Sequence, residues 1–395
     1  MISGVYYPKI NGAVVAVSNM VNSLSARGHQ VNLVTRRERG SPRVENLNGV
    51  RIVRVGNPGF KLSSRIALSF EQFYAALKVA RADAPDVIHA HGFTSLLAGA
   101  ALGVSIGRPV VVSFHGIQRL WSEQARWRNP LTFDFMLPIE RALLRMTTVI
   151  LAQSNLLKRV ITQVYEVRYE KIVVLPNPID TQRFEYATPA ARDSPVVLFV
   201  GSLMKVHGPD ILVEALPHVL QRFPKAKLVI VGKGPLKNLL SKRIGELGLS
   251  DSVSLLDEVG DQRRLSEIYH TSRLVVIPLR YTGYILSLVG EEAMACGRPV
   301  VTTMTLDEEL SKVGVVKSGT TPEELAEAIS SVLSWGDNDY GRVSQTARRF
   351  AEETFSFEAV GSSLESIYKQ AVYGSQRIDG GYDGGAKLFT DAHLP

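Results

Sequence analysis

Two adjacent acids, Glu291 and Glu292, stand near the start of a predicted helix in LSLVGEEAMACGRPVV, residues 286–301. We expect this helix to begin near Ser287, which places both acids in its first turn. A carboxylate there can accept hydrogen bonds from ribose hydroxyls. It can equally oppose the positive end of the helix dipole and need no ligand. The residue types alone leave both interpretations open.

Three histidines lie at the ends of two predicted strands. His89 and His91 occur in DVIHAHG, and His115, followed by Gly116, occurs in VVSFHG. Ligands of open parallel sheets bind at the carboxyl ends of the strands, so these positions suit a site. One histidine at a strand end is more often structural, whereas three together favour a ligand contact for at least one. We select His115.

Glycine turns ahead of helices form a second pattern. Asn11 and Gly12 in YYPKINGAVV precede an amphipathic helix, and Gly232 and Gly234 in IVGKGPL separate a strand from the next helix. Glycine lets the N–H groups of a helix start approach a phosphate closely. Each turn alone is also compatible with an ordinary connection. The G-x-G-x-x-G spacing is missing, which disfavours an NAD-dependent oxidoreductase or sugar epimerase.

A polar loop follows the strand VVLFVGS in the second half of the chain. It carries Ser202, Lys205 and His207, and a glycine and a long helix come next. This loop and the Gly232 turn should face one crevice at the carboxyl ends of their strands, which suits phosphates and a nucleoside.

Two stretches mix aromatic and basic residues, namely 60–81 and 119–133. Such a helix can lie in a bilayer interface, where its cations meet anionic headgroups. It can also simply cover a domain with a solvated face. The membrane interpretation is slightly favoured for the second stretch only. No apolar run approaches the 18 residues of a membrane span.

Composition limits the remaining possibilities. The only cysteine is Cys296, so the chain can form neither an internal disulfide nor a cysteine-based zinc site, and we predict no metal or cofactor. Residues 1–190 hold 23 Lys and Arg against 12 Asp and Glu, a net +11, and the rest hold 22 against 26, a net −4. The basic half should attract an anionic partner. With no secretory signal in its first residues, we expect a cytoplasmic protein, peripheral at the cytosolic membrane face if the membrane interpretation holds.

Short β-branched runs alternate with helical patterns, which predicts an α/β fold with parallel sheets. The Pro-rich segment 176–195 divides them, so we expect two doubly wound domains in the 395 residues. Only Met1–Tyr7 can supply the first strand, which is short unless the natural chain begins earlier. The predicted strands are 30–36, 50–56, 86–92, 108–116, 147–154, 171–177, 196–202, 226–232, 252–257, 273–279 and 298–303.

From about Tyr6 to Tyr373 the chain resembles the retaining glycosyltransferases of the two-Rossmann (GT-B) type, which include glycogen synthases, sucrose synthases and phosphatidylinositol glycosyltransferases. The resemblance is carried by YYPKINGAVV, SARGHQVNLVT, DVIHAHG, SFHG, LPNPID, FVGSLMKVHGPDILVEAL, IVGKGP, GEEAMACGRPVV and ETFSFEAVGSSLESIY. It implies two Rossmann-like domains facing a central cleft: an acceptor-binding domain (1–180) and a nucleotide-sugar-binding domain (190–352). A closing helix (353–373) crosses back to the first domain, and a flexible tail (374–395) follows.

The resemblance also implies roles for single residues. Glu292 matches the second acid of the family's E-x7-E motif, which holds the donor ribose. Gly12 matches the glycine turn near the donor phosphates, and His115 matches the histidine near the transferred sugar. The candidate catalytic residues are His115, Lys205 and His207, and the candidate donor-binding residues are Gly12, Ser202, Gly232, Gly234, Tyr284, Ser287 and Glu292.

The departures from the family pattern concern the charges of the donor site. Ser202 and His207 occupy the positions of an Arg and a Lys that neutralise the diphosphate, although Lys205, or His207 when protonated, can reach it. Tyr284, or Thr282 in a shifted alignment, replaces the first acid of E-x7-E. Each lost charge-stabilising group typically costs about 10² to 10³ in rate.

We therefore predict retaining transfer of a hexosyl group from a nucleoside diphosphate sugar to a sugar or lipid-linked acceptor. The alternative is a glycosyltransferase-like binding protein or partner subunit without turnover, because of the altered donor site. An anionic membrane surface is a further predicted partner of the basic half, and nucleic acid is not.

Overall fold

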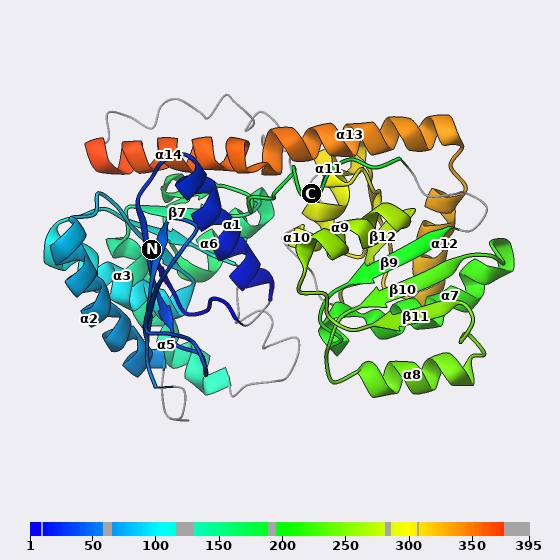
Figure 1. Ribbon diagram of the computed structural model, residues 1–395, viewed down its shortest axis with the longest axis horizontal. Helices are drawn as coiled ribbons and strands as arrows, with labels where there is room; N and C mark the ends of the chain where they lie inside the picture. Colours follow the sequence, from blue (N-terminus) through cyan, green and yellow to red (C-terminus); the bar gives the residue numbers. More distant parts are fainter. Residues whose placement is uncertain are drawn as a thin grey trace. The chain divides into compact units, whose positions relative to one another are not determined.

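The computed structural model describes residues 1–8, 11–57, 65–115, 130–188, 195–280, 286–305 and 308–374. They form two compact units, which Figure 1 shows with their labelled elements. Unit 1 holds residues 1–178 and the helix that begins at Phe357, and unit 2 holds residues 179–356. The predicted tail, apart from Gly374, lies outside the described residues.

The sheet of unit 1 has the strand order β3-β4-β2-β1-β5-β6-β7-β8. All neighbouring strands are parallel except β3 and β4, which pair antiparallel. The central strand β1 is only two residues long. The strands are β1 (Ile2–Ser3), β2 (Val31–Arg36), β3 (Val44–Leu47), β4 (Val50–Val55), β5 (Ile88–His91), β6 (Val110–Ser113), β7 (Val149–Ala152) and β8 (Ile172–Val174).

Helix α1 (Gly12–Ala26) begins where the Asn11 side chain accepts a hydrogen bond from the Val14 amide at 3.0 Å. Such a cap satisfies an N–H group that has no partner inside the helix. The apolar face of α1 packs on β2 and on the last helix of unit 1. The other helices of this unit are α2 (Arg65–Asp83), α3 (Phe93–Ile106), α5 (Pro130–Met146), α6 (Asn155–Tyr165), the 3₁₀ helix η1 (Tyr169–Lys171) and α14 (Phe357–Tyr373).

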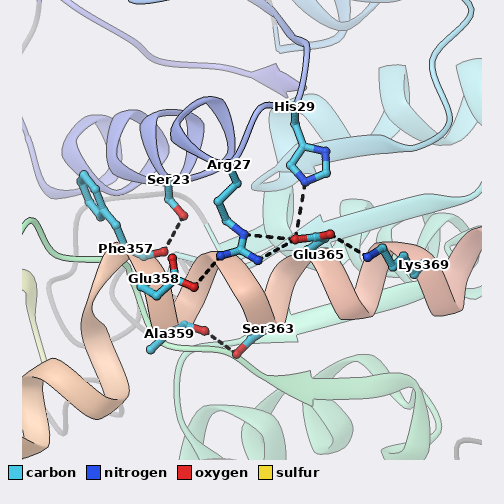
Figure 2. Close-up of polar contacts among 9 residues, drawn as sticks. All are labelled: Ser23, Arg27, His29, Phe357, Glu358, Ala359, Ser363, Glu365 and Lys369. Atoms are coloured by element: carbon cyan, nitrogen blue, oxygen red, sulfur yellow. Dashed lines mark hydrogen bonds and ion pairs between the residues drawn. The ribbon is translucent and has the colours of Figure 1, made fainter.

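Helix α14 is far from α1 in the sequence but packs along it. Arg27, the C-cap residue of α1, forms ion pairs with Glu358 at 2.7 Å and with Glu365 at 2.8 Å, and Lys369 approaches Glu365 to 2.7 Å (Figure 2). At Gly361 a Cβ atom would lie 2.5 Å from the Ser23 hydroxyl, so a larger residue there would have to displace the Ser23 side chain. Shape and charge together hold the C-terminal helix in unit 1.

Helix α1 also holds both points at which the chain leaves unit 1. The Asn19 side chain donates a hydrogen bond to the Pro178 carbonyl at 2.8 Å. The Ser23 hydroxyl donates one to the Phe357 carbonyl at 3.0 Å. Pro178 thus contributes a carbonyl acceptor although it has no N–H group to donate.

Unit 2 has a six-stranded parallel sheet in the order β11-β10-β9-β12-β13-β14. Its core lies between the central strands and helices α7 and α12. The strands are β9 (Val196–Val200), β10 (Lys227–Val231), β11 (Val253–Leu256), β12 (Leu274–Ile277), β13 (Val300–Thr302) and β14 (Val315–Lys317). The helices are η2 (3₁₀, Lys205–His207), α7 (Pro209–Arg222), α8 (Lys237–Glu246), α9 (Gln262–Thr271), α10 (Leu288–Ala295), α11 (Glu308–Lys312), α12 (Pro322–Leu333) and α13 (Asp337–Phe355).

Two doubly wound parallel α/β units confirm the predicted fold class, and a strand forms within every predicted segment. The sequence analysis missed β3 and β14. Strand β3 is largely exposed and pairs antiparallel at the sheet edge, so it lacks the apolar run of the inner strands. Strand β14 has three residues, too few for a periodic pattern.

Candidate functional site

The three histidines singled out in the sequence form one cluster in unit 1. His89 and His91 lie on β5, and His115 lies just after the neighbouring strand β6. His91 Nδ1 is 3.1 Å from His115 Nε2, and their rings are stacked with centroids 5.4 Å apart. The rings of His89 and His91 stack with centroids 4.3 Å apart. Parallel strands bring the side chains together because their carboxyl ends meet at one sheet edge.

His115 is held on its other side by two residues that the sequence analysis missed. The Gln153 amide nitrogen donates to His115 Nδ1 at 2.9 Å and to the Asn177 side-chain oxygen at 2.9 Å. Gln153 follows β7 and Asn177 follows β8, so both stand at the same strand-end edge as the histidines. A polar residue directly after a buried strand was the available signal for Gln153, whereas Asn177 stands three residues after the end of β8.

These contacts assign the neutral tautomers. Because Gln153 donates to His115 Nδ1, the His115 proton lies on Nε2 and is donated to His91 Nδ1. The His91 proton then lies on Nε2, which has no hydrogen-bond partner among the described residues. Both ring nitrogens of His115 are therefore engaged inside the cluster.

His89 is fixed by contacts on both ring nitrogens. Its Nε2 is 2.7 Å from the Ser113 hydroxyl, and its Nδ1 is 2.5 Å from the Tyr368 hydroxyl of α14. Tyr368 is 279 residues away in the sequence. His89 therefore ties the sheet to the C-terminal helix, which is a structural role.

The cluster is uncharged at neutral pH. Burial lowers the pKa of His115 to about 4, and burial together with the neighbouring rings lowers the pKa of His91 well below its usual value. The pKa of His89 is lowered well below its usual value, again mainly by burial. The site can offer neutral imidazole hydrogen bonds but no fixed positive charge.

Gly12 begins α1, directly after the capping residue Asn11. The helix follows β1, the central strand of the sheet beside β5, so this helix start lies at the same sheet edge as the histidines. The predicted positions of Gly12 and His115 thus share one edge of unit 1.

In unit 2 the two predicted loops pack directly on each other. The Leu203 amide donates to the Lys233 carbonyl at 2.8 Å, and the Leu236 amide donates to the Leu203 carbonyl at 3.0 Å. A Cβ atom at Gly232 would overlap the carbonyl oxygen of Gly201. Glycine at this position permits backbone-to-backbone contact between the loops after β9 and β10.

Ser202, Lys205 and His207 lie on the first of these loops, where Ser202 and Lys205 are exposed and His207 is half-buried. His207 Nδ1 donates to the Ser202 carbonyl at 2.9 Å. Neutral His207 therefore presents an unprotonated Nε2, which cannot donate to a phosphate. Gly234, on the loop after β10, packs against the backbone of Leu203, which lies on the same loop as Ser202.

Helix α10 begins at Leu288 with Ser287 in the N-cap position, close to the predicted start. Only Glu291 lies in the first turn, so the prediction that Glu292 lies there too is wrong by one position. Both acids are buried, whereas an acid that only opposes a helix dipole needs no burial. Tyr284 and Thr282 lie outside the described residues.

Glu292 is 5% exposed and accepts a hydrogen bond from the Tyr269 hydroxyl at 2.8 Å. Burial raises the pKa of Glu292 to about 7, although the Tyr269 bond opposes this shift. The carboxyl group therefore changes its charge near neutral pH. Tyr269, on α9, was not identified from the sequence because a tyrosine on an amphipathic helix has no distinctive pattern.

The structure also has a cavity of about 370 Å³ in unit 1. It lies between the first residues of β2 and β5 and the last turns of α14, and His89 and Tyr368 are among its lining residues. Of the three strand-end histidines, only His89 is among its described lining residues, and the candidate catalytic and donor-binding residues are not.

Comparisons with known proteins cover most of the chain. Residues 10–183 match the family described as Glycosyltransferase Family 4, and residues 194–334 match Glycosyl transferases group 1. An uncharacterized glycosyltransferase of Methanocaldococcus jannaschii is 26% identical over 400 residues, which is 94% of this chain and 98% of the relative.

A D-inositol 3-phosphate glycosyltransferase of Xylanimonas cellulosilytica is 25% identical over 395 residues, covering 91% of this chain and 92% of the relative. Among solved structures, sucrose-phosphate synthase from Thermosynechococcus elongatus has a TM-score of 0.77 at 20% identity. That similarity covers 95% of this chain and 100% of the synthase.

Proposed function

Because the chain belongs to the GT-B glycosyltransferases, we propose that it transfers a hexosyl group from a nucleoside diphosphate sugar to an acceptor with retention of configuration. The single observation that carries the proposal is the packing of the two glycine loops in unit 2, with Gly232 against Gly201. Glycine loops between a strand and a helix can present backbone N–H groups to phosphates, and these two loops follow β9 and β10.

Helix α10 supplies the second part of the proposed donor site. It follows β12, which pairs with β9 in the sheet, so it starts at the same strand-end edge as the glycine loops. In this proposal Glu292 binds the ribose hydroxyls, and Ser287 lies near the phosphates at the start of the helix. Tyr284 occupies the position at which the family has the first acid of its E-x7-E motif. The pKa of Glu292, raised to about 7 by burial, lets its carboxyl group accept or donate a hydrogen bond near neutral pH.

Unit 1 is the proposed acceptor side, where His115 would lie near the transferred sugar. The net charge of +11 for residues 1–190 favours an anionic acceptor, such as a phosphorylated or lipid-linked sugar. The phosphate-bearing acceptor in the name of the Xylanimonas relative is of this class. No cofactor is required, because the donor is itself activated.

We extend the proposal to a cytoplasmic protein that binds an anionic membrane surface. No helix in the described part of the chain is both long and apolar enough to cross a membrane. Helix α2 exposes Ile66, Phe70 and Tyr74 at four-residue spacing, and the Lys78 ammonium lies 4.6 Å from the centre of the Tyr74 ring. This stripe suits a bilayer interface. The sequence analysis preferred the stretch 119–133, of which residues 119–129 lie outside the described residues.

The test of the transfer reaction is a panel of UDP- and GDP-sugars incubated with the protein, with and without a lipid extract. We expect nucleotide release that increases with acceptor. Binding without release, unchanged by acceptor, would contradict transfer and favour the alternative, a binding or partner subunit. The presence of Ser202 and His207 where the family has an Arg and a Lys favours that alternative.

The membrane proposal has a separate test. Sedimentation with anionic vesicles at low salt should pull down the protein, and 1 M salt should release much of it because charges are screened there. The absence of sedimentation at low salt would remove the membrane proposal and leave the transfer proposal untouched.

A further inference from the structure

The proposed donor site lacks the two cations that the family places on the loop after β9, since Ser202 and His207 stand there. A diphosphate leaving group gains negative charge as the sugar departs, so the site needs a positive group. The second glycine loop contributes Lys233, but this side chain is paired with Glu258 at 3.6 Å. Lys205 is an exposed cation of the first loop, and a cation from another element of unit 2 can add to it.

Arg280 is tied to the same loop by its backbone. It follows β12, and its amide donates to the Val206 carbonyl at 3.0 Å, between Lys205 and His207. The contact is reinforced at Gly208, where a Cβ atom would overlap the Pro278 carbonyl oxygen. Arg280 therefore emerges beside the loop from which the family's cations are missing.

The side chain of Arg280 is held by one ion pair, and most of its N–H donors have no partner among the described residues. One terminal nitrogen, Nη2, forms an ion pair with Asp210 in the first turn of α7, where the helix dipole stabilises a carboxylate. Among the described residues, the guanidinium has no other hydrogen bond. A guanidinium offers five N–H donors in a planar arrangement that matches phosphate oxygens. Asp210 limits the motion of the arginine, and the remaining donors stay available.

We propose that Arg280 binds the diphosphate of the donor in place of the cations replaced by Ser202 and His207. This inference rests on the proposed function and names a residue that the family motifs do not. Asp210 is then a positioning residue, because it acts only by holding the arginine. The proposal explains how a site with an altered loop retains a charge that stabilises the leaving group.

Calorimetric titration of the full chain with UDP, GDP and their nucleosides tests the inference. In the variant Arg280→Gln we expect affinity for the preferred diphosphate to fall about 10- to 100-fold, the usual value of a charged hydrogen bond. Affinity for the matching nucleoside should not change, because it has no phosphate. Arg280→Lys should retain part of the affinity through its charge.

The matched control is Arg222→Gln, since Arg222 is an exposed arginine of the same unit that pairs with Glu327 at 3.0 Å. It should leave both affinities unchanged. Adding Ser202→Arg to Arg280→Gln should restore diphosphate binding. Equal affinity of wild type and Arg280→Gln for the diphosphate, or equal losses for diphosphate and nucleoside, would overturn the inference alone. If the wild type bound neither diphosphate, the proposed function would fail with it.

Discussion

The strand-end edges of the two units present different chemical groups to a ligand. In unit 1 the edge is lined by side chains, and His91, His115 and Gln153 form an uncharged hydrogen-bonded chain in which His91 is buried and the other two are partly buried. In unit 2 the edge is formed by backbone, with two glycine loops in direct contact and polar side chains exposed around them. Neutral imidazoles suit sugar hydroxyls, whereas exposed backbone N–H groups suit phosphates. The difference supports the proposal that unit 1 takes the acceptor and unit 2 the donor.

The largest expected effect comes from filling the space between the glycine loops. Gly232→Ala should lower the free energy of unfolding of unit 2 by on the order of 3 kcal/mol or more, because backbone atoms of Gly201 must move. Urea denaturation measures this change. Gly245→Ala on α8 is the control, because nothing lies within 4 Å of its added Cβ and it should stabilise by about 0.5–1 kcal/mol. Similar effects of the two variants would show that the loops are not in close contact.

A second prediction concerns the buried acid of unit 2. Burial raises the pKa of Glu292 to about 7 in the folded chain, so the folded state binds more protons than the unfolded state above pH 4.5. Its stabilising contribution is present below that pH and is lost as the pH rises through 7. Glu292→Gln should therefore exceed the wild type in stability at pH 8, by on the order of 2–3 kcal/mol. Parallel pH–stability curves from pH 5 to 8 would contradict the assignment.

The third prediction concerns the hydrogen bond between Gln153 and His115 in unit 1. In Gln153→Glu a carboxylate faces His115 Nδ1, which favours a protonated ring and should raise the pKa of His115 above its present value of about 4. NMR titration of the His115 ring protons measures the shift. Gln163→Glu, at an exposed position of α6, is the control and should leave this pKa unchanged. An unshifted His115 in Gln153→Glu would show that the hydrogen bond does not set its state.

The smallest effect is expected at the surface contact that holds α14. Side-chain bonds from Lys369 and Arg27 lower the pKa of Glu365 to about 2, so the pair stabilises above pH 4.5 and is lost as the pH falls toward 2. Glu365→Gln should lower the melting temperature slightly at neutral pH and low salt. In 1 M salt the difference should disappear, because exposed charges are screened. A loss that persists at high salt would indicate a packing role instead.

The sequence predicted the parts of the site that depend on local order. Strand ends were readable from β-branched runs, so His89, His91 and His115 were expected at one edge, and the glycine turns of unit 2 were expected in one crevice. The sequence could not predict which side chains from distant parts of the chain contact these residues. Tyr368 reaches His89 from across 279 residues, and Arg280 reaches Asp210 from across 70. Such pairs depend on packing between elements and leave no periodic signal in the chain.

Hydrogen–deuterium exchange with and without the UDP- or GDP-sugar that binds tests most directly whether unit 2 holds the donor through its loops. We expect slower exchange in the segments 201–208 and 232–236 and at the start of α10. Unchanged exchange in all three segments of unit 2 at saturating nucleotide sugar would contradict the account.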